Sequence, residues 1–192
     1  MRRRDSGPRA QTAEPTTAFE CCAPLAADEL SEGTWIVLLR ADRIPHVALL
    51  QDGVYHSLEH DGFHCRSAAE LWRLIRARAV PSVLCRLRAA PATRARPFFE
   101  RHGGLDGDVD CFVPVRDYCA SWFPAAAACD YAYELLPLLA STGALDKAGS
   151  LHLPALRPGV PFELPRYTRA EIRARIEHVR TSGAAAGRGA RA

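Results

Sequence analysis

The fold of this chain is decided by the stretch that runs Trp35-Ile36-Val37-Leu38-Leu39 and then, after a short loop, His46-Val47-Ala48-Leu49-Leu50-Gln51-Asp52-Gly53-Val54-Tyr55-His56-Ser57-Leu58. Short continuous apolar runs of this length indicate buried strands. Asp-Gly between two apolar runs is a strong hairpin signal, since both residues tolerate the positive φ of a tight turn. The sequence therefore predicts strands at 35–39, 46–50 and 54–58, the last two joined as a hairpin.

After this stretch the sequence predicts one helix and one strand, followed mainly by helices. Ser67 and Glu70 have the spacing of a capping box, in which each side chain bonds the backbone N–H of the other residue at a helix start. The further expected elements are a helix from there to before Pro81, a strand at 82–87, a short strand at 111–113, helices at 116–123 and 126–141, a mostly extended segment at 151–166, and a terminal helix opened by a second capping box at Thr168 and Glu171. This order favours an α+β fold, a small antiparallel sheet with helices packed on one side.

The two ends of the chain differ in composition from its middle. Residues 1–18 are rich in Arg, Thr, Pro and Ala and read as a disordered leader. Residues 183–192 consist of Gly, Ala and Arg and read as a frayed tail. We expect a single α+β domain over residues 19–182.

Composition and charge point to an ordinary globular domain. Hydrophobic residues make up 48% of the chain and charged residues 24%, so a packed core is expected. The net charge is +3, and much of the excess lies in arginines near the two ends. A nucleic-acid interface would place its arginines on one element among aromatic residues, so no specific nucleic-acid partner is predicted.

The seven cysteines form no C-x-x-C pair, and their number is odd. This argues against a disulfide framework or a zinc site of standard spacing and favours a reducing, cytoplasmic location. His60, His64 and Cys65 lie on a predicted turn without a fourth ligand nearby, so no metal or other cofactor is expected. The sequence has no apolar run long enough to span a membrane.

The stretch from Gly33 to His56 resembles the opening of the circularly permuted papain-like fold, the family of lecithin retinol acyltransferase and related bacterial amidases and hydrolases. In that family a Gly precedes the first strand, a His begins the second, and a second polar residue follows on the third. The resemblance implies a cysteine-dependent hydrolase or acyltransferase that acts on an amide or ester without a cofactor. It makes His46 the general base and His56 the residue that orients it. The substrate would be a small molecule, a peptide or a lipid.

The same resemblance requires a nucleophilic cysteine at the start of a later helix, where the helix dipole stabilises a thiolate. Cys119 follows Asp117, which has the character of an N-cap, and it is the preferred nucleophile. Cys129 is the alternative, although it lies inside a stretch that is expected to be helical already.

The hairpin register decides whether the two histidines can work together. With a two-residue turn at Asp52-Gly53, His46 and His56 face opposite sides of the sheet, whereas a three-residue loop brings them onto one face. The catalytic hypothesis requires the three-residue loop. The alternative function is a non-catalytic α+β module that binds a protein partner.

Overall fold

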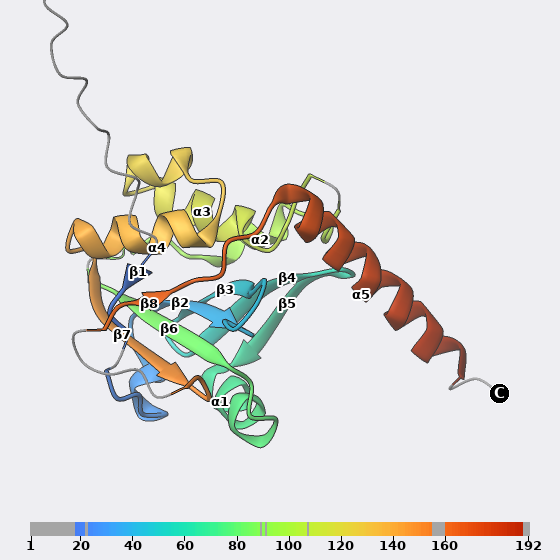
Figure 1. Cartoon of the computed structure of the whole chain (residues 1–192), viewed down its shortest axis with the longest axis horizontal. Helices are drawn as coiled ribbons and strands as arrows, with labels where there is room; N and C mark the ends of the chain where they lie inside the picture. Colours follow the sequence, from blue (N-terminus) through green and yellow to red (C-terminus); the bar gives the residue numbers. More distant parts are fainter. Residues whose placement is uncertain are drawn as a thin grey trace, which may run out of the picture.

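The computed structural model describes residues 18–21, 23–88, 90, 92–106, 108–154 and 160–189 (Figure 1). They form a six-stranded antiparallel sheet, a two-stranded sheet and helices, so the fold class is α+β as predicted. The strands are β1 (Ala18–Phe19), β2 (Thr34–Leu39), β3 (His46–Gln51), β4 (Val54–Glu59), β5 (Gly62–Ser67), β6 (Ser82–Leu87), β7 (Leu145–Leu151) and β8 (Phe162–Glu163). The helices are η1 (Asp28–Ser31), α1 (Ala68–Ala77), α2 (Arg96–Glu100), α3 (Val113–Ala120), η2 (Pro124–Ala128), α4 (Ala132–Ser141) and α5 (Arg169–Gly189), where η denotes a 3-10 helix.

The main sheet has the order β5-β4-β3-β2-β6-β7, and all neighbouring strands are antiparallel. Strands β2, β3, β4 and β6 confirm the strands that were predicted at 35–39, 46–50, 54–58 and 82–87. Strand β5, whose residues His64 and Cys65 were expected on a turn, and strand β7 were not predicted from the sequence. Both are edge strands that are partly exposed, so they carry no continuous apolar run.

The β3–β4 hairpin closes with two residues. Asp52 and Gly53 have φ values of 48° and 80°, as a tight two-residue hairpin turn requires. Gln51 therefore pairs with Val54, and Leu49 pairs with His56. This is the register that places His46 and His56 on opposite faces of the sheet.

Helices cover both faces of the main sheet, not one face as the sequence analysis expected. Ile36 and Leu49 belong to a core that the helices α2, α3 and α4 cover. Trp35 and Leu50 point the other way and form a second core with residues of α1. Figure 1 shows α1 on the opposite side of the sheet from these three helices. Strands buried on both faces explain why their sequences are continuous apolar runs and do not alternate.

The capping box that was predicted for the first helix is present. The backbone N–H of Glu70 donates to Oγ of Ser67, and the Ser67 N–H donates to the Glu70 carboxylate at 3.0 Å. Helix α1 ends at Ala77, ahead of Pro81 as expected, and its buried face carries Leu71 and Ile75.

The helical region after residue 110 differs from its prediction. Residues 111–113 form no strand; helix α3 begins at Val113, with Pro114 in its first turn, where proline is well tolerated. The expected helix at 126–141 is divided into η2 and α4, which begins at Ala132. Helix α4 contains Pro137 and still continues to Ser141.

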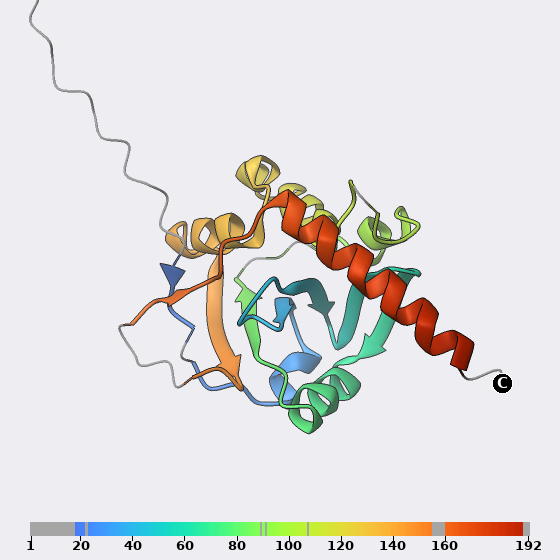
Figure 2. The same ribbon diagram turned by 45° about the vertical axis from the view of Figure 1, so that its right-hand side comes forward.

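At the ends of the chain, β1 pairs with β8 and α5 begins behind the predicted capping box. Helix α5 continues to Gly189, so most of the segment that was predicted to be a frayed tail is helical. Figure 2 shows α5 passing in front of the sheet and extending beyond it. Residues 1–17 of the predicted leader lie outside the described residues. No helix in the described part of the chain is both long enough and apolar enough to cross a membrane.

Candidate functional site

Strands β3 and β4 pair only near their connecting turn, and a loop from far along the sequence bonds to both beyond it. The paired residues end at Leu49 on β3 and His56 on β4. Farther along, the N–H of Leu105 donates to the carbonyl of Glu59 on β4 at 3.0 Å. The N–H of Val47 on β3 donates to Sγ of Cys111 at 3.3 Å. A strand N–H that has lost its ladder partner must find another one, and here the partner is a cysteine sulfur.

Asp110 holds Cys111 at the start of α3. One oxygen of its buried carboxylate accepts from the backbone N–H groups of Phe112 and Val113, at 2.8 and 3.2 Å, so these first donors of the helix are satisfied. Its other oxygen accepts from Arg169 of α5 at 2.7 Å. Cys111 is thereby fixed between the helix start, the sheet and the first turn of α5.

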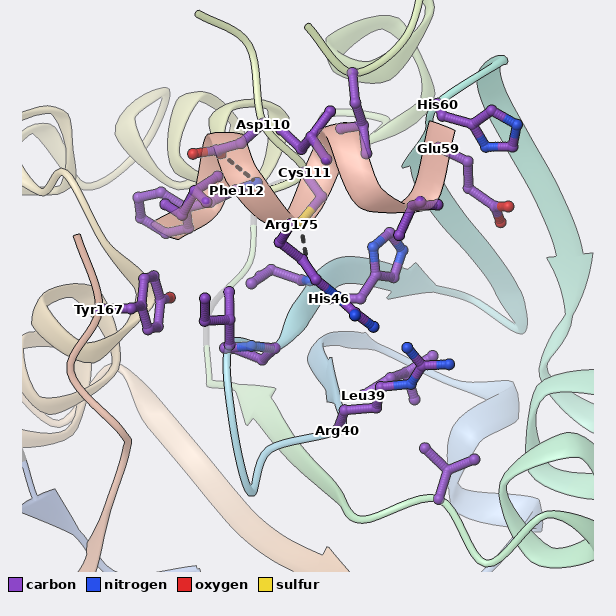
Figure 3. Close-up of a pocket in the computed structure, with 18 of the residues that line it drawn as sticks. Leu39, Arg40, His46, Glu59, His60, Asp110, Cys111, Phe112, Tyr167 and Arg175 are labelled. Atoms are coloured by element: carbon purple, nitrogen blue, oxygen red, sulfur yellow. Dashed lines mark hydrogen bonds between the residues drawn. The ribbon is translucent and has the colours of Figure 1, made fainter. Parts of the chain in front are cut away.

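Cys111 and His46 line the same pocket (Figure 3), which has a volume of about 330 Å³. Its walls come from β2, β3 and β4, from α1 and from α5. Ligand pockets of proteins typically have volumes of roughly 300–1,000 Å³. The pocket is thus large enough for a small ligand, and a thiol and an imidazole both face into it.

Burial keeps both groups uncharged. It lowers the pKa of His46 below the usual 6.5, an effect that the carboxylate of Glu59 partly offsets and the guanidinium of Arg40 reinforces. Burial also raises the pKa of the Cys111 thiol to about 12, helped by the charge of Asp110 and opposed by the hydrogen bond from Val47. At neutral pH the pocket is therefore lined by a neutral thiol and a neutral imidazole.

Neither cysteine that was predicted as the nucleophile lines this pocket. Helix α3 begins at Val113, so Cys119 lies in its last turn and not its first, and Asp117 does not cap the helix. Cys119 is fully buried in the core, where burial raises the pKa of its thiol to about 12. Cys129 follows η2, is also buried and also has a raised pKa. The C-terminal end of a helix opposes a thiolate, so the expected benefit for Cys119 is absent.

His56 lies on the opposite face of the sheet from His46. It is buried against Phe63, with the two rings stacked at 5.9 Å, and against Phe99. Its Nδ1 is 3.5 Å from Sγ of Cys65, an exposed cysteine on the edge strand β5. Burial lowers the pKa of His56 and raises that of Cys65. The structure therefore does not bring His56 to His46, and it pairs His56 with a cysteine outside the pocket.

Near the β4–β5 turn, three side chains have the chemistry of metal ligands. Atoms of Glu59, Asp61 and His64 lie within 4.8 Å of one another, and Nε2 of His64 is 2.7 Å from Asp61. The sequence analysis considered His60, His64 and Cys65 as a metal group and expected no metal. Of these only His64 belongs to the group, in which Asp61 is exposed and Glu59 and His64 are half-buried.

Cys111 is not among the site residues predicted from the sequence, because residues 111–113 were expected to form a short strand. Asp110 followed by Pro114 is a sequence pattern that indicates the start of a helix. An Asp in that position caps the first N–H groups of a helix, and Pro is enriched in the first turn. That signal would have started the helix near residue 113 and placed Cys111, not Cys119, at its N-terminal end.

We expect Asp110→Ala to lower the free energy of unfolding by about 1–3 kcal/mol, because two helix N–H groups and Arg169 lose their acceptor. Asp110→Asn retains an oxygen that can accept from the helix start, so its loss should be smaller. Urea unfolding followed by circular dichroism measures both. Equal losses in the two variants would contradict the capping role of Asp110.

No protein-family model, curated protein or solved structure gives a significant match to this chain.

Proposed function

We propose that this protein is a cysteine-dependent hydrolase or acyltransferase that acts on an amide or ester, with Cys111 as the nucleophile and His46 as the general base. One observation carries the proposal: Cys111 stands at the start of α3 and bonds to the residue after His46, and both side chains line one pocket. The resemblance of residues 33–56 to the permuted papain-like family supports the same chemistry and the same role for His46.

The proposed reaction begins with a proton transfer. His46 takes the thiol proton as the sulfur of Cys111 attacks the carbonyl carbon of the substrate, forming a C–S bond and an oxyanion. The oxyanion collapses, the bond to the alcohol or amine breaks, and the leaving group takes the proton from His46. Water or an acceptor alcohol then attacks the thioester with His46 again as base, which releases the acyl product and restores the thiol.

The oxyanion needs a donor close to the sulfur. Phe112 and Val113, at the helix start, give their N–H groups to Asp110, so they do not serve. The N–H of Val47 already points at Sγ of Cys111. We propose that it turns to the substrate oxygen as the C–S bond forms, in the manner of an oxyanion hole.

Because the pKa of the Cys111 thiol is raised, we expect the thiol to lose its proton to His46 only during attack on the substrate. This affects the choice of chemical probe. A preformed thiolate would react quickly with any alkylating agent, whereas a neutral thiol depends on His46 at the moment of attack. The proposal is therefore general-base catalysis, and an activated ester is a better probe than an alkylating agent.

The test is a burst experiment with p-nitrophenyl butyrate in the Cys65→Ala background, which removes the exposed thiol among the described cysteines. We expect a burst of p-nitrophenolate close to one equivalent per protein and a butyryl group on Cys111 in peptide mass spectrometry. Cys111→Ala in this background should remove the burst and the adduct. Its fold should persist, because only one weak N–H···S hydrogen bond is lost.

Cys119→Ala is the matched control and should keep the burst. A burst that survives Cys111→Ala would reject Cys111 as the nucleophile. If no cysteine acylates faster than in the unfolded chain, the alternative function applies, a non-catalytic module that binds a protein partner. The thiol chemistry fits a reducing compartment, so we propose the cytoplasm as its location.

A further inference from the structure

The acidic side chains that line the pocket already have arginine partners. Glu59 lies 3.6 Å from Arg66. Asp110 and Asp130 both pair with Arg169, at 2.7 and 3.5 Å. These carboxylates therefore do not neutralise the other arginines around the pocket.

Two of those other arginines come from distant parts of the chain and converge. Among the described residues, Arg40 and Arg175 have no ion-pair partner, and Figure 3 shows both side chains reaching the same space beside His46. Burial lowers the pKa of Arg40 most, and the charges of Arg175 and then Arg43 lower it further, so the Arg40 and Arg175 guanidinium groups repel each other. Asp42 offsets this only in part and lies 3.8 Å from Arg43. Two neighbouring guanidinium groups that have no carboxylate partner can both donate charge-assisted hydrogen bonds to an anion.

The backbone at Arg40 reinforces this interpretation. Its φ is 60°, in the left-handed region that costs free energy for a residue with a side chain. This conformation directs the chain into the loop between β2 and β3, whose residues Arg40, Ile44 and Pro45 line the pocket. Strain of this kind is common where a ligand is bound.

The anion site adjoins both the proposed reacting groups and an apolar wall. Arg40 lowers the pKa of His46, so its charge acts at the imidazole. On one side the pocket is lined by Leu71 and Leu74 of α1, and on the other by Ile172 and Ile176 of α5. A ligand that fills the pocket would therefore place an apolar chain between the helices and a negative charge near His46.

We propose that Arg40 and Arg175 together bind the anionic group, a carboxylate or a phosphate, of a substrate whose apolar chain lies between α1 and α5. Its amide or ester would lie at Cys111, a few bonds from the charge. The statement that an amide or ester lies at Cys111 rests on the proposed function. The anion site at Arg40 and Arg175 does not depend on it.

The test compares N-octanoylglycine, which has an apolar chain, an amide and a carboxylate, with its neutral partner N-octanoylglycinamide. Isothermal titration calorimetry uses the full chain, both as wild type and as Cys111→Ala, so that binding is measured without turnover. We expect the acid to bind about 10-fold or more tightly than the amide, since a charge-assisted hydrogen bond is lost in the amide. Octyl phosphate in the same titration distinguishes a phosphate ligand from a carboxylate.

Arg40→Gln and Arg175→Gln should each weaken binding of the preferred anion about 10-fold or more and leave that of the amide unchanged. Arg180→Gln, at an exposed position on the same helix and outside the pocket lining, should change neither. Because the two pocket variants relieve repulsion, the thermal midpoint of the ligand-free protein should not fall.

Equal binding of both anions and the amide, or wild-type anion binding by both pocket variants, would overturn the proposal. If Cys111 is acylated in the burst experiment, neither of these results would contradict its role as the nucleophile. Conversely, charge-dependent binding without acylation would retain the anion site and reject only the catalytic role.

Discussion

Replacing His46 by alanine should slow the burst acylation of Cys111 about 10²–10⁴-fold, the usual contribution of a positioned general base. The loss should be large because the thiol has a pKa of about 12 and does not ionise by itself at neutral pH. The thiolate fraction would then come only from the thiol's own equilibrium, so the residual rate should rise with pH through the whole accessible range.

The pH profile of the wild type tests the same assignment. The neutral imidazole is the active form, and burial lowers the pKa of His46. The burst rate should therefore rise with a midpoint below pH 6.5, the ordinary value, and be level above it. A midpoint above 6.5, or a profile unchanged by His46→Ala, would contradict His46 as the base.

His56→Ala is the informative comparison, since the sequence analysis gave His56 a role in orienting His46. The two-residue turn puts its ring among Phe63 and Phe99 on the other face of the sheet. We expect this variant to lose stability but to acylate at the wild-type rate per folded molecule. A loss of rate comparable to that of His46→Ala would restore the role that was predicted from the sequence.

Gly149→Ala should lower the free energy of unfolding by about 3 kcal/mol, the upper end of the usual cost of overpacking. Gly149 lies in β7, opposite Leu84 of β6, and the segment before β2 crosses directly over it. An added Cβ would overlap the carbonyl oxygen of Ala23 and approach Cγ of Leu25 to 2.6 Å. The obstacle includes backbone that also bonds β7 through the N–H of Ala23, so it cannot move without breaking that bond.

Gly103→Ala is the matched control, because a Cβ there would meet no described atom within 4 Å. Its effect should remain within about 0.5 kcal/mol, as for most surface substitutions. Urea unfolding of both variants and the wild type gives the comparison. A Gly149→Ala midpoint equal to that of the wild type would mean that residues 23–25 do not pack over β7.

The sequence by itself determined the elements whose signals are local. Strands β2 and β3 are confirmed because their residues are buried on both faces, which favours continuous apolar runs. Strand β4 is confirmed because the Asp52-Gly53 turn signal returns the chain beside β3. Helices α1 and α5 begin behind their capping boxes, because the two reciprocal hydrogen bonds depend only on neighbours three residues apart. The α+β class follows from these elements.

Only the tertiary structure decided the candidate site. The register that separates His46 from His56 depends on φ values at Asp52 and Gly53, and both alternatives were open in the sequence. Cys111 bonds to Val47, the residue after His46, because β3 and β4 stop pairing beyond Leu49 and a loop from far along the chain bonds to both strands. No local pattern records this contact, since it joins residues 64 positions apart through a strand N–H that has no ladder partner. The chemistry of the pocket therefore comes from hydrogen bonds that close only when the whole chain is folded.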